Sequence, residues 1–388
     1  MLNSKYKNNR GDWMAIQYED VVSVGAGSLA GRYLRMFWQP VFIGRLLELK
    51  RPQPIKILGE AFTIYRGETG IAHVVAPRCP HRGLSLAVAR VMGDSLECFY
   101  HGWTFDACGQ CVSQPAENPG FAHNVSIKSY PTTERNGLIF AYLGDGMQPN
   151  FPELNVFSEP CIIENKADVR PWPFFAQIEN GIDETHFNFA HRRTKFDDIG
   201  MNNGLPELSC QETAYGILRI AKRGNALRKG HYIMPNWSLS SKYEHHEGWS
   251  NHIVWRVPTD DENHISFTSD VIYKTGSEAE VYRAALTEKS IRRDQMAPAI
   301  DVIRNVLAGK MHPDEIPKDH PDIVMIQDGV CCMGQPIRRS RGDDILGISD
   351  RQVSLLRRIW NRELEALRDG GTLKNWQIPQ GLETTRGV

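Results

Sequence analysis

The stretch CPHRGLSLAVARVMGDSLECFYHGW, residues 79–103, holds two short pairs of metal-binding side chains. Cys79 stands two positions before His81, and Cys98 stands three positions before His101. Zinc sites commonly take like ligands from one turn, whereas each turn here offers one thiolate and one imidazole. That order suits a [2Fe–2S] cluster in which one iron takes two cysteines and the other takes two histidines. The pattern therefore predicts such a cluster, with zinc or unrelated core residues as the alternative.

The chain around the two pairs has the pattern of β structure. Short alternating runs, separated by Gly, Asp and Pro, predict a small antiparallel β domain that presents the pairs on two loop tips. The runs are AFTIYRG (61–67), GIAHVVAP (70–77), DSLECFY (94–100) and GWTFDACGQCVS (102–113). The last run contains a C-x-x-C, formed by Cys108 and Cys111. We interpret these two cysteines as small residues beside a hairpin glycine, with a metal or redox role as the alternative.

A second candidate metal site lies in FFAQIENGIDETHFNFAHRRTKF, residues 174–196. On a helix, Asp183 and His186 would share one face because they are three residues apart. His186 and His191 are five apart, roughly 140° around an ideal helix, so both can reach one ion only if the helix ends or loosens between them. A common oxygen-activating iron site takes two histidines and one carboxylate. The two histidines therefore require a carboxylate from elsewhere in the chain.

Asp328 is our candidate for that carboxylate. It is a single acid in the apolar part of PDIVMIQDGVCCMGQP, residues 321–336. An unpaired carboxylate would be costly in such surroundings, and a metal ion would compensate it. The other nearby acids, Asp322, Asp343 and Asp344, lie in polar surroundings, and we expect them to be solvated.

Length, charge and cysteine content narrow the class of protein. A chain of 388 residues is long enough for two domains with separate cores. The net charge of −1 gives no long-range attraction to nucleic acid or to an anionic membrane, so we expect neither as a partner. We find no signal peptide and no stretch near the roughly 18 apolar residues of a spanning helix. Eight cysteines without a secretory signal favour a reducing, cytoplasmic location.

The two motifs together resemble those of the Rieske non-haem iron ring-hydroxylating oxygenases, specifically the terminal oxygenase α subunits of the phthalate-dioxygenase-like branch. The resemblance rests on C-P-H-R-G, C-x-Y-H-G-W, E-N-x-x-D-x-x-H-x(4)-H and a distal Q-D. It extends over the segments 24–41, 255–267 and 338–350. Respiratory Rieske proteins place a serine where this chain has Trp103. Fewer donors to the cluster sulfurs imply a lower reduction potential here.

The resemblance implies an α+β architecture. Residues 1–38 would form a helical lead-in that belongs to the catalytic domain, and residues 39–150 a Rieske [2Fe–2S] domain of antiparallel β structure. Residues 151–388 would form a mononuclear iron catalytic domain with a large antiparallel sheet, the helix-grip or START-like fold. The segment 142–155, rich in Pro and Gly, is typical of a linker.

Three elements of the catalytic domain can be predicted from local pattern. Alternation predicts strands at 231–241 and 251–258. Helical spacing of apolar residues predicts an amphipathic core helix at 349–371, with Ser349 as its N-cap and Gly370 at its end.

The resemblance also implies ligands and partners. It assigns Cys79, His81, Cys98 and His101 to the cluster, and His186, His191 and Asp328 to a mononuclear non-haem Fe(II). In a head-to-tail homotrimer, Asp183 would bridge His101 of one subunit to His186 of the next, with Asn180 beside it at the catalytic site. Stacking of trimers into hexamers is left open. A separate NAD(P)H-dependent reductase, with or without a ferredoxin, would supply electrons, because the chain has no G-x-G-x-x-G at the start of a βαβ unit.

The implied reaction uses O2 to hydroxylate an aromatic ring. O- or N-demethylation shares the same iron ligands, and a Rieske electron carrier without oxygenase activity is an alternative of a different class. Substrate identity and regiochemistry stay open, although the branch similarity favours an aromatic acid. Arg192, Arg193 and Arg256 are candidate partners of a substrate carboxylate, with a surface charge as the simpler interpretation. The candidate pocket walls, each equally compatible with core packing, are Ile178, Asn180, Met234, Trp237, Trp255 and Met325.

Overall fold

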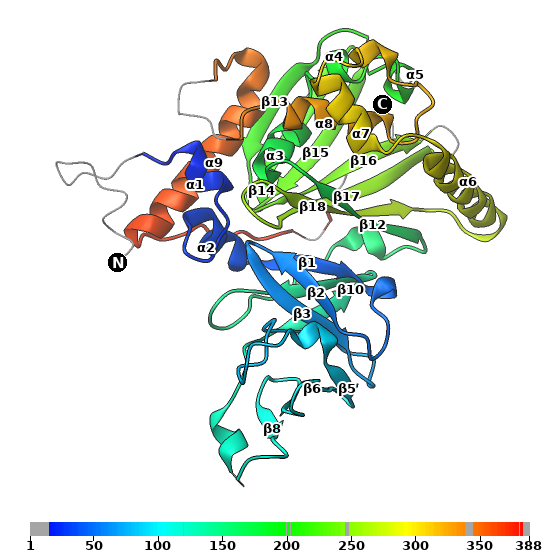
Figure 1. The fold of residues 1–388 in the computed structure, drawn as a ribbon. Helices are drawn as coiled ribbons and strands as arrows, with labels where there is room; N and C mark the ends of the chain where they lie inside the picture. Colours follow the sequence, from blue (N-terminus) through cyan, green and yellow to red (C-terminus); the bar gives the residue numbers. More distant parts are fainter. Residues whose placement is uncertain are drawn as a thin grey trace.

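The computed structural model describes residues 15–118, 120–198, 200–201, 203–244, 248–337, 344–379 and 381–382. Two β-rich bodies follow one another along the chain (Figure 1), a smaller one in blue to cyan and a larger one in green to orange. The first 14 residues of the expected lead-in lie outside the described residues. So do residues 338–343 of the segment that contributed to the resemblance.

Two short helices open the described chain, α1 (Tyr18–Val22) and α2 (Leu29–Arg35). Ser28 caps α2, because its hydroxyl oxygen accepts a hydrogen bond from the Gly31 N–H at 3.1 Å. Both helices contact α9 (Arg351–Asp369), and Tyr33 lies edge-on to Trp360 with ring centroids 5.5 Å apart. The N-terminal helices therefore pack on the C-terminal helix of the larger body.

Three small antiparallel sheets form the N-terminal β domain, in the orders β1-β11-β10, β2-β3-β4-β9 and β5-β6-β7-β8. The residues around the two cysteine pairs have a buried cluster of their own, which includes Phe105 and Trp103. This arrangement confirms the predicted antiparallel β domain. Its strands are β1 (Trp38–Ile43), β2 (Gln53–Ile57), β3 (Glu60–Arg66), β4 (Ala72–Val75), β5 (Arg90–Met92), β6 (Ser95–Glu97), β7 (Thr104–Phe105), β8 (Cys111–Ser113), β9 (Ser129–Tyr130), β10 (Thr132–Arg135) and β11 (Leu138–Tyr142).

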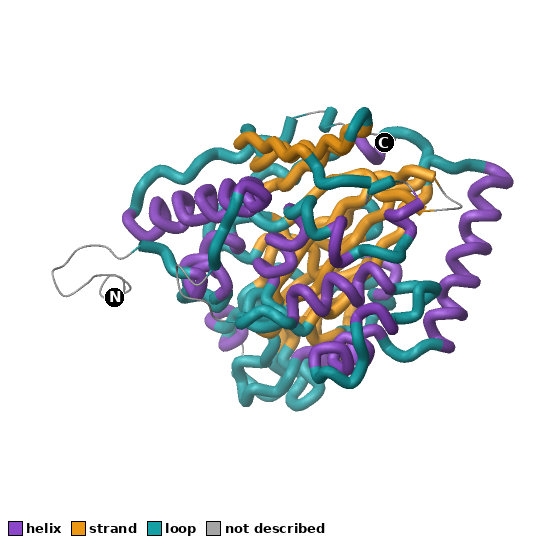
Figure 2. The backbone as a smooth tube through the Cα atoms, turned by 90° about the horizontal axis from the view of Figure 1, so that it is seen from above, coloured by secondary structure: helices purple, strands orange, loops and turns teal. Residues whose placement is uncertain are grey.

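The larger body is built on a seven-stranded antiparallel sheet, in the order β12-β18-β17-β16-β15-β14-β13. Seen from above (Figure 2), the strands lie in the centre and the helices lie around them. This sheet confirms the predicted α+β class. The strands are β12 (Ile162–Arg170), β13 (Glu207–Glu212), β14 (Gly216–Arg223), β15 (Ala226–Ile233), β16 (Trp237–Glu244), β17 (Gly248–Pro258) and β18 (His264–Ile272). The helices that follow or separate them include α3 (Phe174–Ile182), α6 (Gly276–Gln295), α7 (Ala299–Leu307) and α8 (Ile323–Met333).

One face of the large sheet packs on the β domain. Phe140 of β11 lies edge-on to Trp255 of β17 at 5.6 Å, and the Asn236 side-chain amide donates a hydrogen bond to Gln39 Oε1 at 2.8 Å. Side chains alternate along a strand, so β17 turns Val254 and Arg256 to the opposite face. That opposite face is the one that borders the large cavity described below.

The local predictions differ from the structure in two places. Residues 231–241 do not form one strand: they span the end of β15, a turn at 234–236, and the start of β16. The predicted strand at 251–258 lies within β17. Residues 143–154, the greater part of the predicted linker, contain neither helix nor strand.

None of the helices in the described ranges is long and apolar enough to cross a membrane.

The C-terminal helix begins later than Ser349. A 3-10 turn, Ile348–Asp350, precedes α9, and Asp350 occupies the N-cap position. The Asp350 carboxylate accepts a hydrogen bond from the Gly347 N–H at 2.7 Å, and this contact closes the turn. Gly370 ends the helix in the left-handed conformation, as predicted. The predicted apolar stripe is buried in the core: Val353, Leu356, Ile359, Trp360 and Leu364.

Candidate functional site

The two cysteine–histidine pairs lie on two loops of matching construction. In the first loop, the Cys79 N–H donates to Leu84 O at 2.9 Å, and the Gly83 N–H donates back to Cys79 O. In the second, the Cys98 N–H donates to Trp103 O at 2.8 Å, and the Gly102 N–H donates to Cys98 O. Both glycines have positive φ, 76° and 71°, which favours glycine at these positions. The sequence thus folds each pair into a tight turn.

The four candidate cluster ligands converge on the space between these turns. Cys79 and Cys98 are each 2% exposed, and burial, followed by the neighbouring Cys98, raises the pKa of the Cys79 thiol to about 11. The His81 and His101 ring centroids are 4.4 Å apart, and Trp103 stacks on His81 at 4.5 Å. His81 Nδ1 is buried without a hydrogen-bond partner among the described residues. Two buried thiols beside an orphaned imidazole nitrogen fit a cluster with two thiolate and two imidazole ligands.

The C-x-x-C pair does not join this group. Cys108 is exposed and Cys111 is buried, and both are free thiols. The Asp106 carboxylate accepts hydrogen bonds from the Cys108 and Gln110 N–H groups, and Gly109 has a φ of 86°. This geometry is a hairpin turn that the glycine and the aspartate make, in keeping with our interpretation.

The two histidines of the second motif lie at the two ends of a one-turn helix. Helix α3 ends at Ile182, and Asp183, its C-cap residue, has extended dihedral angles. The following helix α4 (Phe187–Ala190) has His186 at its N-cap and His191 at its C-cap. The His186 and His191 Nε2 atoms are 3.2 Å apart. The helix therefore breaks before His186, and α4 ends at Ala190, directly before His191. Asp183 and His186 thus do not share a face of one helix.

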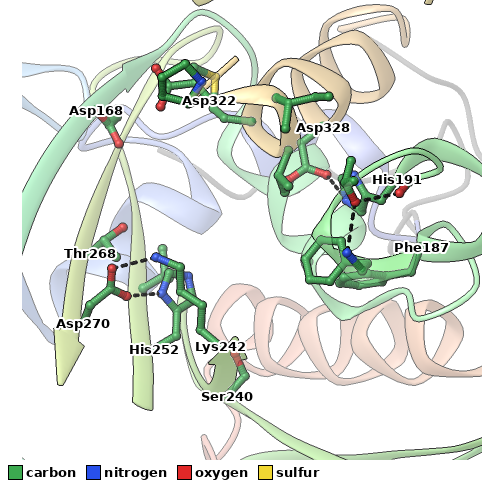
Figure 3. Close-up of a pocket in the computed structure, with 18 of the residues that line it drawn as sticks. Asp168, Phe187, His191, Ser240, Lys242, His252, Thr268, Asp270, Asp322 and Asp328 are labelled. Atoms are coloured by element: carbon green, nitrogen blue, oxygen red, sulfur yellow. Dashed lines mark hydrogen bonds and ion pairs between the residues drawn. The ribbon is translucent and has the colours of Figure 1, made fainter. Parts of the chain in front are cut away.

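Asp328, from helix α8, completes the group and lies beside His191 on one side of the cavity (Figure 3). Its Oδ1 atom lies 3.1 Å from His191 Nε2 and 3.6 Å from His186 Nε2. One ligand atom from each of the three residues lies within 4.8 Å of the others, a spacing that could hold a metal ion. Burial alone would raise the pKa of Asp328, but the two histidines bring it well below its usual value. This donor set, two imidazoles and one carboxylate, fits Fe(II).

Neighbouring groups orient each of these three side chains. His191 Nδ1–H donates to Gln327 Oε1 at 2.9 Å, and His186 Nδ1–H donates to the Asp183 carbonyl oxygen at 2.8 Å. Both rings thus turn Nε2 toward the centre. Asn180 Nδ2 donates to Asp328 Oδ1 at 2.8 Å. Sequence reasoning missed the role of Gln327, although it directly precedes Asp328 in the chain.

The Asp183 side chain lies at the edge of the group. Its Oδ1 accepts a hydrogen bond from the Thr185 N–H at 2.7 Å, and its Oδ2 is 3.9 Å from His186 Nδ1. Burial raises the pKa of this carboxyl, while His186 opposes the shift. Within one chain, the backbone of Asp183 rather than its carboxylate therefore makes the short contact with His186.

Sequence reasoning also missed Glu184, which clamps the loop between Asp183 and His186 to the sheet. The Glu184 carboxylate is buried and accepts from Arg219 of β14 at 2.9 Å and from Arg228 of β15 at 2.6 Å. Arg223 of β14 donates to the Glu184 carbonyl oxygen at 3.0 Å. The three arginines lie far from Glu184 in sequence, so only the sheet pairing brings them to it.

A cavity of about 980 Å³ opens beside the three candidate iron ligands. Of the expected pocket walls, Asn180 and Met325 line it. Ile178 and Trp237 line a separate space of about 20 Å³ instead. Met234 and Trp255 line neither and are buried in the main core. The correction has a physical cause, because strand alternation turns Trp237 and Trp255 away from the cavity and stacks them at 5.4 Å.

The three candidate arginines have different surroundings. Arg192 is exposed and donates to Asn188 O at 2.9 Å. Arg193 lines the cavity but is exposed and lies beside Asp314. Arg256 is half-buried and lines the cavity, so the simpler interpretation as a surface charge fails for this residue.

Comparison with known proteins adds a family match and relatives. Residues 37–131 match the model of the Rieske [2Fe–2S] domain. The chain is 33% identical over 272 residues to the 3-chlorobenzoate-3,4-dioxygenase oxygenase subunit of Comamonas testosteroni, covering 64% of this chain and 61% of that protein. It is 28% identical over 372 residues to the 5,5'-dehydrodivanillate O-demethylase oxygenase subunit of Sphingobium sp., covering 92% of this chain and 81% of that protein.

A solved structure has the same fold. The Pseudomonas putida CBB5 NdmA QL mutant with theobromine superposes with a TM-score of 0.64 at 21% identity. The superposition covers 87% of this chain and 93% of that chain. At this identity the likeness supports the fold alone.

Proposed function

We propose that this protein is a terminal oxygenase that hydroxylates an aromatic compound with O2. The chain carries a Rieske [2Fe–2S] domain and is homologous to Rieske oxygenase α subunits. The observation that carries the proposal is the convergence of His186, His191 and Asp328, whose ligand atoms all lie within 4.8 Å of one another. Two imidazoles and one carboxylate leave further positions on the metal for O2.

The proposal gives each metal group its own residues. Cys79, Cys98, His81 and His101 would hold the [2Fe–2S] cluster, and the three residues above would hold Fe(II). Together these groups would supply single electrons and the activation of O2. The protein's own part is to fix ring orientation, through Gln327 and the Asp183 carbonyl, and to hold the Asp328 carboxylate through Asn180.

We propose that electrons cross between subunits of a head-to-tail homotrimer. Figure 1 draws the loops next to β6 at one end of the molecule and α4 near the opposite end, which supports transfer between copies rather than within one. Tyr100, beside His101, is 53% exposed, so a neighbouring subunit can approach the cluster loops. Asp183, whose carboxylate is partly exposed, is the proposed bridge between His101 of one subunit and His186 of the next.

Electron supply and location complete the proposal. A separate NAD(P)H-dependent reductase, with or without a ferredoxin, would reduce the cluster. A cytoplasmic location suits such a donor and suits the eight cysteines, which are all free thiols. We propose residues 39–150 as the unit that receives the electrons and residues 151–388, with the N-terminal helices, as the unit that performs the oxygenation.

Demethylation is the second candidate reaction. The relative named as an O-demethylase aligns with 92% of this chain, a larger share than the 64% aligned with the dioxygenase. The proposed iron ligands serve both reactions, so the placement of the substrate decides between them. An aromatic acid is the first class of compound to test, because one relative is named for a chlorobenzoate.

Metal analysis of the purified chain, followed by turnover, tests the proposal. We expect about three iron atoms and about two acid-labile sulfides per chain. His186→Ala should remove about one iron and leave the electron paramagnetic resonance signal of the reduced cluster intact. A panel of aromatic acids and their methyl ethers, with a surrogate reductase, should give hydroxylated product or formaldehyde coupled to NADH consumption. About two iron atoms and no product from any compound would instead indicate an electron carrier.

A further inference from the structure

The wall of the cavity that faces the candidate iron ligands is polar. Alternate residues of the central strands point into the cavity, including His252, Val254 and Arg256 on β17 and Thr268 and Asp270 on β18. Eleven Lys and Arg side chains line the cavity against seven Asp and Glu. The excess of positive charge favours an anionic occupant over a neutral hydrocarbon.

Most cations inside the cavity already have a carboxylate. Arg219 and Arg228 share Glu184. On the opposite wall, Asp270 accepts from Lys242 at 2.8 Å and from His252 at 2.6 Å (Figure 3). Glu184 and Asp270 already neutralise the cations around them. Binding a substrate anion at these cations would therefore require breaking an existing ion pair, which costs free energy.

Arg256 is the exception among the described cations of the cavity interior. Among the described residues, no carboxylate lies within 4.0 Å of its guanidinium, and one side-chain hydrogen bond runs from its Nη1 to Ser266 Oγ at 2.5 Å. Its Nε and Nη2 atoms have no partner among the described residues. Arg256 is half-buried and lines the large cavity, and it also borders the small space beside Ile178.

The surroundings of Arg256 make an anion favourable there. Burial, and then the neighbouring Arg170, lower the pKa of Arg256 to about 10. Arg170 is itself 3.5 Å from Asp168, which is half exposed and therefore a weak counter-ion. A second anion at Arg256 would offset the repulsion between the two guanidinium groups.

We propose that Arg256 binds the carboxylate of an aromatic-acid substrate through its free Nε and Nη2 edge, as a specificity-determining residue of the oxygenase site. A guanidinium edge offers two parallel N–H donors, which match the two oxygens of a carboxylate. Asp328 and Arg256 line the same cavity, so the anchored acid would extend its ring toward the candidate iron ligands. The inference rests on the proposed function and narrows its substrate class.

Binding of carboxylates and their neutral amides to the full chain tests this assignment. Suitable pairs are benzoate with benzamide and 3-methoxybenzoate with 3-methoxybenzamide, measured by calorimetry, with acetate as a carboxylate that lacks a ring. We expect the native chain to bind the aromatic acids more tightly than the amides and more tightly than acetate. Arg256→Gln should weaken binding of the acids by about 10-fold to 100-fold and leave binding of the amides unchanged. Arg256→Lys should recover part of the loss, because it restores the charge without the two-donor edge.

Lys318→Gln is the matched control, since Lys318 is an exposed cation of the cavity rim. It should leave the affinity for both acids unchanged. Equal affinity for acids and amides in the native chain, or full affinity for the acids in Arg256→Gln, would overturn the assignment. Iron content and the cluster signal are measured in the same samples, so the loss of the oxygenase function and the loss of this subsite can be told apart.

Discussion

At the scale of single residues, sequence names candidate metal ligands more readily than the residues that surround them. Cys79, His81, Cys98 and His101 could be named because their chemistry is specific and their spacing is local. Asp328 could be named because a lone acid in an apolar stretch needs a partner. The contacts of Gln327 and Glu184 could not be predicted, because their partners His191 and Arg219 lie 136 and 35 residues away in the chain.

Asp183→Asn tests the proposed bridge between subunits. The amide keeps the size of the side chain but removes the charge that would hold the His101 N–H of the neighbouring subunit. The Asp183 carbonyl would keep its contact with His186. We expect iron and sulfide contents to stay unchanged and steady-state turnover to fall by about 100-fold. Stopped-flow reoxidation of the reduced cluster should slow equally. Asp301→Asn, on an exposed acid of α7 that does not line the cavity, is the control. Native reoxidation in the Asp183 variant would remove Asp183 from the electron path.

Gln327→Ala tests the orientation of His191. Without its acceptor, His191 Nδ1–H loses the contact that turns Nε2 toward Asp328. We expect the affinity for Fe(II) to fall about 10-fold to 100-fold, as measured by titration of the iron-depleted chain with Fe(II). The exposed Gln211→Ala serves as the control. An unchanged titration curve would mean that Gln327 plays no part in metal binding.

At the scale of elements, periodicity predicts existence better than boundaries. The spacing of apolar residues predicted the buried face of α9. It did not predict the 3-10 turn before the helix, because that turn depends on a contact between Asp350 and Gly347. Alternation found the region of β15 and β16 but not the turn between them. Alternation shows that Trp237 and Trp255 have a defined face of the sheet, but it does not tell whether that face borders the cavity or the core. The answer depends on which face the β domain covers, and contacts between distant segments decide this.

Asp270→Asn tests the charged cluster that joins β16, β17 and β18. Burial would raise the pKa of Asp270, but Lys242 and His252 lower it well below its usual 3.8. A depressed pKa in the folded state gives stability that is present above the unfolded-state value of about 3.8 and is lost as pH falls through the folded-state value. We expect the variant to lose about 3 kcal/mol of unfolding free energy in urea at neutral pH. The gap between variant and native chain should stay constant from about pH 8 to about pH 5. A gap that already closes in that range would mean that Asp270 is not fully ionised there.

At the scale of the whole molecule, the two-body architecture follows from the length and from the two separate motifs. The packing of the two bodies on each other cannot be predicted in this way, because contacts such as that of Phe140 with Trp255 join segments more than a hundred residues apart. The arrangement in Figure 1 leads to a test of assembly, since the loops next to β6 and helix α4 lie at opposite ends of the molecule.

Co-expression of two inactive variants tests transfer between subunits. Cys98→Ser lacks a cluster ligand and His186→Ala lacks an iron ligand, so each alone should be inactive. In a head-to-tail ring of equal amounts, about a quarter of the interfaces would join an intact cluster to an intact iron site. We therefore expect about a quarter of native turnover from the mixture. No recovery, in mixed rings that mass spectrometry confirms, would point to transfer within one chain.

The placement of the loops next to β6 and of helix α4 at opposite ends of the molecule in Figure 1 has a consequence for the cell. Under the proposed transfer between subunits, a newly made single copy would accept electrons from the reductase but would have no short path to its own iron site. Loss of reducing equivalents to peroxide would then be held back until the ring closes, and assembly itself would protect the cell from a hazardous side reaction.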